Sequence, residues 1–255
     1  MCLALVALDA HPTYGCVIAA NRDEFHARAS APAHWWDDGI LAGRDLVAGG
    51  TWFGVLRTGR WALVTNFREG IPRDPYAPSR GELVTGMLRD AGSPMRASAA
   101  LLPQGGRYHG FNLLVGDGSD AAFASNRASG ALALGPGIHG LSNHLLDTPW
   151  PKLLRGKARL AAWLAGADPG IEAAFALLAD REPACDAALP QTGVSPQWER
   201  LLSSPFVVSP DYGTRSSTLL LVARDGGARF IERSFDAGGN ASGEVAFDFH
   251  IGTAG

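Results

Sequence analysis

Cysteine is scarce in this chain of 255 residues, which excludes a disulfide framework. The three cysteines, Cys2, Cys16 and Cys185, form an odd set spread over the whole length. Sparse cysteines are typical of proteins from a reducing compartment, where thiols stay free. We therefore expect a cytoplasmic location.

Long apolar segments are also absent. No run approaches the ~18 residues that a helix needs to cross a bilayer. The longest stretches, such as residues 217–223, have the length of a strand. Basic residues do not precede the first apolar run, and Asp9 interrupts it, which argues against a secretory signal. The sequence predicts no integral membrane segment.

Charge of either sign is modest. The formal net charge is −3, and 20 of the 22 basic residues are arginine, because only Lys152 and Lys157 are lysine. Such a chain has no general attraction to nucleic acid or to anionic membranes. A hydrophobic content of 46% describes an ordinary globular protein. We expect one domain over residues 1–255.

Motifs for common metals and cofactors are missing. The chain has no P-loop, no H-E-x-x-H and no C-x-x-C, and its seven histidines are scattered. Residues 135–140 match G-x-G-x-x-G, but they include Pro136, open no clear helix and precede no acidic residue at the required distance of ~20 positions. The sequence predicts neither a metal nor an organic cofactor.

The order of apolar runs and turns predicts strands, helices, strands, helices and strands. This order favours an α+β fold with antiparallel sheets over repeated βαβ units. Two hairpins come first, one from runs 2–8 and 15–21, the other from runs 40–57 and 61–66. Helices are predicted at 81–91, 94–102, 152–165 and 169–178, and further strands at 111–117, 121–126, 130–134, 206–208, 216–224, 228–235 and 244–251.

Cys2 carries the most specific chemistry. It follows Met1 directly, and removal of Met1 leaves a thiol and a free α-amine on one residue. Such an amine can serve as the general base for its own nucleophile. The alternative is a plain core position, because cysteine is often buried in strands.

The segment Asn21–Glu24 is expected beside Cys2. Symmetric pairing of the first hairpin places Cys2 opposite Asn21, and Arg22 and Asp23 follow at the same end. A guanidinium lowers the pKa of a nearby thiol, and a carboxylate can orient an α-ammonium group. The alternative is a structural ion pair at a strand end.

Polar residues at later strand ends extend the candidate site. Asn66 and Asn143 each end an apolar strand, where an amide can donate to an oxyanion, although asparagine also caps turns. In the second hairpin Asn66 is expected to face Thr51 and Trp52. Arg215 precedes a core strand, a position that suits a substrate carbonyl or carboxylate, with a surface arginine as the alternative.

Short motifs follow one another in order along the chain. They are Met1-Cys2, Asn21-Arg22-Asp23-Glu24-Phe25, Gly43-Arg44-Asp45, Gly49-Gly50-Thr51-Trp52, Thr65-Asn66, Gly110-Phe111-Asn112-Leu113-Leu114, Gly140-Leu141-Ser142-Asn143 and Gly213-Thr214-Arg215-Ser216. This ordered set resembles the NRDE-motif family, also called the transport-and-Golgi-organisation family, from residue 1 to about residue 235. The resemblance implies a four-layer αββα sandwich of two antiparallel sheets, as in N-terminal nucleophile hydrolases of the choloylglycine hydrolase, penicillin V acylase and acyltransferase group.

The resemblance implies an N-terminal cysteine amidohydrolase or acyltransferase acting on an amide or thioester of a small molecule. A non-catalytic protein that binds and traffics haem or an acyl-CoA or lipid ligand is the alternative. Arg22 and Asp23 are adjacent here but separated in the hydrolases, which leaves Glu24 open for the acidic role. The expected catalytic residues are Cys2, Arg22, Asp23, Asn66, Asn143 and Arg215, and the expected substrate-binding residues are Glu24, Trp52, Thr214 and Ser216.

Overall fold

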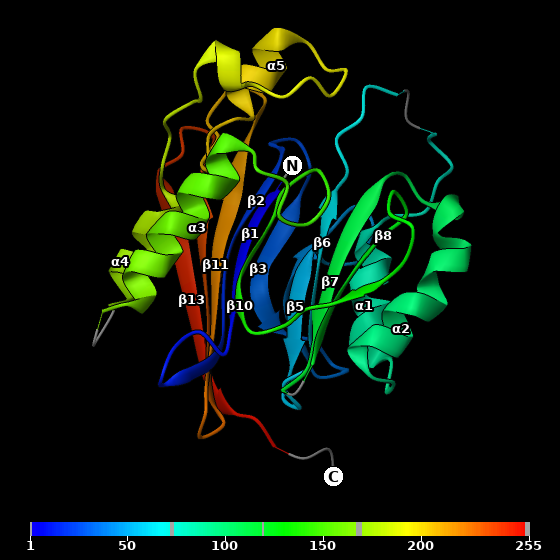
Figure 1. Cartoon of the computed structure of the whole chain (residues 1–255), viewed down its shortest axis with the longest axis vertical. Coiled ribbons are helices and arrows are strands. Elements are labelled where there is room, and N and C mark those ends of the chain that lie inside the picture. The colour runs from blue at the N-terminus through cyan, green and yellow to red at the C-terminus, as the bar shows by residue number, and fades with distance from the viewer. Residues whose placement is uncertain (1, 72–73, 119, 167–169, 253–255) are drawn as a thin grey trace.

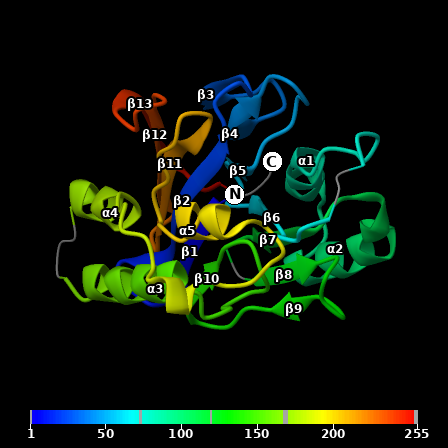
Figure 2. The same cartoon turned by 90° about the horizontal axis from the view of Figure 1, so that it is seen from above.

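The computed structural model describes residues 2–71, 74–118, 120–166 and 170–252. Two antiparallel sheets face each other, and helices cover both outer faces (Figure 1). Seen from above, the four layers follow one another as helices, sheet, sheet and helices (Figure 2). This arrangement confirms the predicted α+β sandwich. Met1 and Pro169, where we expected processing and the start of a helix, lie outside the described residues.

The first sheet has six strands in the order β10-β1-β2-β11-β12-β13. Its central strands are the first hairpin and the long strand that enters from the C-terminal part of the chain. The bounds are β1 Cys2–Leu8, β2 Tyr14–Phe25, β10 Gly137–Leu141, β11 Tyr212–Ala223, β12 Gly227–Phe235 and β13 Ala241–His250.

The second sheet has seven strands in sequence order from β3 to β9. Each consecutive pair is antiparallel, so short turns suffice to connect most of them. The bounds are β3 Ser30–Trp35, β4 Ile40–Asp45, β5 Phe53–Leu56, β6 Trp61–Asn66, β7 Phe111–Gly116, β8 Ala121–Ser125 and β9 Leu132–Ala133.

Helices pack on the outer face of each sheet. Helices α1 and α2 lie on the second sheet, and α3 and α4 lie on the first (Figure 1). At the start of α1 the Ser79 hydroxyl accepts from the Gly81 amide at 3.3 Å, but the N-cap residue is Arg80 and no described side chain caps the helix, so the capping box expected from Ser79 and Glu82 is not formed. The bounds are α1 Gly81–Arg89, α2 Pro94–Leu101, α3 Pro151–Leu164, α4 Ile171–Leu178 and α5 Pro196–Leu201, with 3₁₀ helices η1 Leu102–Arg107 and η2 Asp186–Ala188.

Strand β1 shows why its sequence is apolar without alternation. Ala4 and Val6 belong to the core between the sheets, whereas Leu3 and Leu5 belong to the core under α3 and α4. Both faces of the strand are therefore buried, as the uninterrupted apolar run predicts. No helix of the described residues is long and apolar enough to cross a membrane. The cytoplasmic location stays a prediction.

The predicted register of the first hairpin is wrong by one residue. Cys2 pairs with Arg22, and Leu3 pairs with Asn21. The turn is centred on Pro12, because the Asp9 amide donates to the Gly15 carbonyl at 2.8 Å. Residues directly opposite in antiparallel strands point to the same face of the sheet. The slip therefore brings Arg22, in place of Asn21, to the face that carries Cys2.

Other differences from the predicted elements concern edges and ends. Residues 40–57 form two strands, β4 and β5, where one was predicted. Strands β3 and β10 were missed, and both are edge strands whose proline or glycine content weakens the strand pattern. Helix α5 was also missed, and residues 206–208 contribute an isolated bridge at Val208 but no strand.

Candidate active site

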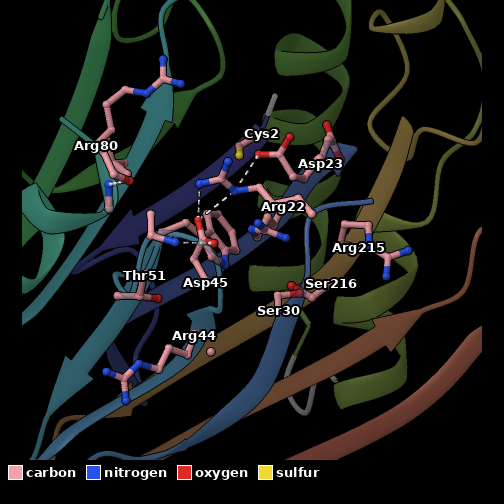
Figure 3. Close-up of a pocket in the computed structure, with 18 of the residues that line it drawn as sticks. Cys2, Arg22, Asp23, Ser30, Arg44, Asp45, Thr51, Arg80, Arg215 and Ser216 are labelled. Atoms are coloured by element: carbon pink, nitrogen blue, oxygen red, sulfur yellow. Dashed lines mark hydrogen bonds and ion pairs between the residues drawn. The ribbon is translucent and has the colours of Figure 1, made fainter. Parts of the chain in front are cut away.

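A cavity of about 690 Å³ is lined by residues of both sheets and of the loops that join their strands. Eight of the ten site residues predicted from the sequence line it, and Asn143 and Thr214 do not. Cys2, Arg22 and Asp23 lie together, with Arg215 and Ser216 on the adjacent strand (Figure 3). The eight are Cys2, Arg22, Asp23, Glu24, Trp52, Asn66, Arg215 and Ser216.

The Cys2 thiol is buried in the wall of this cavity. Its residue is 7% exposed, and the backbone N–H of Asp23 hydrogen-bonds to the sulfur. Burial raises the pKa of the thiol and the negative charge of Asp23 adds to the rise, while the Asp23 N–H and the Arg22 guanidinium oppose it. Arg22 therefore acts in the predicted direction, but desolvation is the larger effect. At neutral pH the thiol is protonated unless a base accepts its proton.

Asp23 is buried behind the nucleophile. Its carboxylate accepts a hydrogen bond from the Thr214 hydroxyl at 2.7 Å, and the residue is 2% exposed. Burial raises the pKa of Asp23, while the charges of Lys152 and Arg22 and the Thr214 hydrogen bond oppose the rise. Glu24 is half-buried instead, and its carboxylate accepts from the Phe25 amide. Asp23 is therefore the acidic residue beside Cys2.

Arg215 reaches the cavity because strand β11 bulges there. Thr214 pairs with Asp23 and Ser216 with Arg22, which leaves Arg215 as the extra residue between them. Such a bulge re-aims a side chain that regular pairing would hold in the ladder. One guanidinium nitrogen, Nη1, lies 3.0 Å from His26 Nδ1. The sequence indicated the arginine but not the bulge.

Two guanidinium groups retain free donor capacity within the part of the chain that is described. Arg22 Nη1 and Arg215 Nε are buried and have no hydrogen-bond partner among these residues. Arg28, which also lines the cavity, is instead bound to Asp45 at 2.6 Å. Arginine N–H groups of this kind suit a carbonyl or carboxylate oxygen of a ligand.

Asn66 and Asn143 are placed one behind the other. Asn66 lines the cavity at the end of β6, whereas Asn143 is fully buried behind it. The Asn143 amide donates to the Asn66 carbonyl at 3.0 Å and accepts from the Ser142 hydroxyl at 3.1 Å. Asn143 thus contacts the backbone of Asn66 and does not reach the cavity. The oxyanion role predicted for Asn143 remains untested.

Trp52 and Thr51 line the cavity with Asn66. The observed pairing of these residues differs from the predicted one. The β5–β6 ladder pairs Phe53 with Leu63, and the Val64 amide donates to the Trp52 carbonyl at 2.8 Å. Trp52 is therefore opposite Val64 and does not face Asn66 directly. Its ring contributes apolar surface to a cavity that is otherwise rich in charge.

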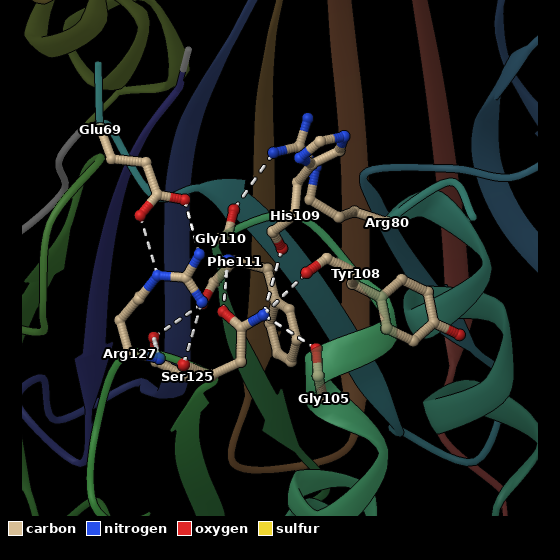
Figure 4. A network of polar contacts seen from close by, with 10 residues as sticks. Glu69, Arg80, Gly105, Tyr108, His109, Gly110, Phe111, Ser125 and Arg127 are labelled. Atoms are coloured by element: carbon tan, nitrogen blue, oxygen red, sulfur yellow. Dashed lines mark hydrogen bonds and ion pairs between the residues drawn. The ribbon is translucent and has the colours of Figure 1, made fainter. Parts of the chain in front are cut away.

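The far wall of the cavity includes Arg80 and His109. A network of hydrogen bonds holds the backbone of this wall in place (Figure 4). Asn126 donates to three carbonyl groups of the preceding loop, including that of His109 at 3.2 Å. Arg80 donates to the Gly110 carbonyl at 3.1 Å. The network links the loop before β7 to the start of α1.

Sequence analysis missed Glu232 in β12. This residue lines the cavity, is 4% exposed, and accepts from the Ala33 amide of the other sheet at 2.8 Å. Burial raises the pKa of its carboxyl group. A signal was available, because Glu232 alternates with Phe230 and Ser234 and must share their inward face.

Lys152 was also missed. It lies in the first turn of α3 and is 1% exposed, and its ammonium group interacts electrostatically with Cys2 and Asp23. Lysine at a helix start opposes the helix dipole, which was the available signal. The described residues contain no group of three or more histidine, cysteine or acidic side chains arranged to hold a metal ion.

The facing sheets with covering helices define the fold of the N-terminal nucleophile hydrolases. The structure superposes on a C2A mutant of a conjugated bile acid hydrolase from Clostridium perfringens with a TM-score of 0.55 and 8% identity, covering 97% of this chain and 92% of the other. An N-acylethanolamine-hydrolyzing acid amidase orthologue from Caenorhabditis elegans gives a TM-score of 0.50 and 10% identity, covering 86% and 92%. At these identities the likeness concerns the fold.

Sequence comparison is more specific. The profile described as Transport and Golgi organisation 2 matches residues 1–237, and the chain belongs to this family. It is 36% identical to the Transport and Golgi organization protein 2 homolog of Homo sapiens and 35% identical to that of Bos taurus. Each match covers 92% of this chain and 93% of the relative. The family predicted from the motifs is confirmed.

Proposed function

We propose that the protein is an N-terminal cysteine amidohydrolase or acyltransferase that acts on an amide or thioester of a small molecule. The cavity volume of about 690 Å³ lies in the range of small-molecule sites. Support also comes from two proteins of similar fold, one named a conjugated bile acid hydrolase and the other an N-acylethanolamine-hydrolyzing acid amidase. Cys2 is the proposed nucleophile.

The observation that carries this proposal is the buried thiol of Cys2 beside Asp23. Burial raises the pKa of the thiol, so it needs a base within hydrogen-bond reach. Once Met1 has been removed, the α-amine of the same residue provides one, with an ordinary pKa of about 7.7–8.0. Asp23 orients this amine, and Arg22 favours the thiolate.

The reaction has two halves. First, the α-amine accepts the thiol proton and the sulfur attacks the acyl carbon, while Asn66 donates to the oxyanion. The C–N or C–S bond then breaks, and the α-ammonium group returns the proton to the leaving group. Water or another acceptor next attacks the thioester on Cys2, and its proton passes through the α-amine to the released thiolate. Arg215 binds the substrate carbonyl or a carboxylate near it.

The test is acetyl transfer from p-nitrophenyl acetate. Intact mass first establishes that Met1 is absent, and nitrophenolate release and acetylation of the protein are then followed. Cys185 is an exposed thiol, so the experiment uses the Cys185→Ser background. Cys16 is expected to react slowly, because burial raises the pKa of its thiol to about 12. We expect acetylation at Cys2 in this background and none after Cys2→Ala.

Equal acetylation of the Cys185→Ser protein and of its Cys2→Ala variant would show that Cys2 is not the nucleophile. A protein that only binds haem or an acyl compound would bind the ester and release no nitrophenolate. The two outcomes separate catalysis from binding on the same fold. Circular dichroism of the Cys2→Ala variant checks that the fold is retained.

Replacement of Asn66 tests the oxyanion contact. Asn66→Ala is expected to slow acetylation by about 10²–10³-fold, the usual effect of losing one donor to a developing oxyanion. The dependence of the rate on ester concentration should show a loss of the maximal rate with little change in binding. Ser30→Ala is the matched control, because Ser30 lines the same cavity from β3. A loss of similar size in both variants would contradict a specific role for Asn66.

A further inference from the structure

Lys152 is a fully buried cation in the layer of helices behind Cys2. The residue is 1% exposed, and Nζ has no hydrogen-bond partner among the described residues. It lies in the first turn of α3, which packs against β1 and β10 (Figure 1). The Ser142 hydroxyl donates to the Cys2 carbonyl at 3.0 Å and so connects the segment ahead of α3 to the nucleophile.

The surrounding charges show what stabilises this cation. Arg68 is the nearby cation, but it is already paired with Glu199 at 2.6 Å, and its guanidinium carbon lies 4.6 Å from the Trp150 ring centroid. Asp23 and Cys2 are the groups whose negative charge favours the ammonium form of Lys152. Buried charges need compensation, and Asp23 is the carboxylate whose charge acts on Lys152.

We propose that the ammonium group of Lys152 keeps Asp23 ionised and favours the thiolate of Cys2 from the helix side of the first sheet. This inference rests on the proposed function, and it makes Lys152 a positioning residue that acts on the α-amine through Asp23 and on the thiolate through its own charge. An ionised Asp23 accepts a hydrogen bond from the α-amine of Cys2, whereas a protonated Asp23 donates to the amine nitrogen and occupies the lone pair that accepts the thiol proton.

The burial of Lys152 sets the pH range over which its side chain is charged. Desolvation and the like charge of Arg68 lower its pKa to about 8, while Asp23 and Cys2 act in the opposite direction. Lys152 is therefore mostly charged at neutral pH and loses its proton as the pH rises through about 8. Above that pH its support for Asp23 and for the Cys2 thiolate is lost.

The first experiment measures the titration of Lys152 directly. Because the chain has only two lysines, protein labelled with ¹³C-lysine gives two side-chain Cε signals, and Lys157→Arg assigns them. In Asp23→Asn the midpoint of Lys152 is expected to fall by about 1 unit or more, since the favourable negative charge is gone. Lys157, paired with Asp147 at 2.6 Å, is the internal control and should not move. An unchanged Lys152 midpoint would overturn the proposal.

The second experiment measures the reactivity of Cys2. Alkylation by iodoacetamide is followed against pH in the Cys185→Ser background, with intact mass showing Met1 removed. Lys152→Met is expected to slow alkylation at pH 7 by about tenfold and to raise the pH midpoint, because a cation near the thiolate is lost. Lys152→Arg, which keeps the charge, should recover most of the rate. A midpoint that stays at the wild-type value in Lys152→Met contradicts the proposal, because a purely structural lysine would not move it.

The two measurements also separate this inference from the proposed reaction. If Lys152→Met does not fold, the titration of Lys152 in wild type and Asp23→Asn decides the question. If p-nitrophenyl acetate never acetylates Cys2 but Asp23→Asn shifts Lys152, the acyl-transfer reaction fails and the charge coupling stands. Suppose that acetylation occurs, but Asp23→Asn does not shift the midpoint of Lys152 and Lys152→Met does not shift the alkylation midpoint of Cys2. The charge coupling is then wrong and the proposed reaction stands.

Discussion

One additional residue ahead of Cys2 is expected to slow acetylation of the thiol by about 10²–10⁴-fold, the usual contribution of a general base. The extension turns the α-amine into an amide, which does not accept a proton. Burial raises the pKa of the Cys2 thiol, so without the amine the thiol stays protonated at neutral pH. The rate of nitrophenolate release is compared between the mature and extended proteins in the Cys185→Ser background.

The matched control carries the same added residue at the C-terminal end of the chain. It should react like the mature protein, and circular dichroism should be the same for all three forms. Equal rates for mature and N-terminally extended protein would mean that Cys2 acts as an ordinary thiol. In that case Asp23 or another group would have to serve as the base.

Replacement of Glu199 by alanine is expected to destabilise the protein by about 3–5 kcal/mol, because it removes the carboxylate that is paired with the buried charge of Arg68. The side chains of Arg68 and Glu199 are only 2% and 5% exposed, and their atoms are 2.6 Å apart. Glu199 also accepts from the Thr192 amide at 2.7 Å, so a partly buried donor loses its acceptor as well. Urea unfolding followed by circular dichroism measures the change.

The neighbouring residue provides the control for Glu199. Arg200 on the same helix pairs with Asp186 at the surface, where both side chains are more than half exposed. Arg200→Ala should therefore lower the free energy of unfolding by no more than about 1 kcal/mol. The double replacement Arg68→Met with Glu199→Leu should recover part of the lost stability, because neither charge then remains buried. Equal effects of the two single replacements would contradict the assignment of the large loss to a buried charge.

Much of the fold followed from local patterns. Strand β1 has the uninterrupted apolar sequence that is typical of a strand buried on both faces, and the structure places Leu3 and Ala4 in two different cores. Helices α1 to α3 were predicted within one or two residues at each end, because caps and prolines mark them. Edge strands β3 and β10 were missed, since they contain proline or glycine and owe their pairing to the neighbouring strand.

The site residues were easier to predict than their arrangement. Sequence motifs named Cys2, Arg22, Asp23 and Arg215, and all four line one cavity. The hairpin register was predicted one residue away from the observed one, because the closing hydrogen bonds of a turn fix the register and the apolar pattern of a two-sided strand does not. A strand with both faces buried gives no polar alternation by which to choose between adjacent registers.

The sequence by itself determined the identity of the nucleophile candidate, the family and the α+β class with antiparallel sheets. These depend on residues close together in the chain or on the order of elements. Only the tertiary structure decided that Asn143 lies behind Asn66, that a bulge turns Arg215 into the cavity, and that Lys152 and Glu232 join the site. Those contacts join segments more than 70 residues apart or depend on pairing between strands, and burial of a charge is a property of the packed molecule that no local pattern specifies.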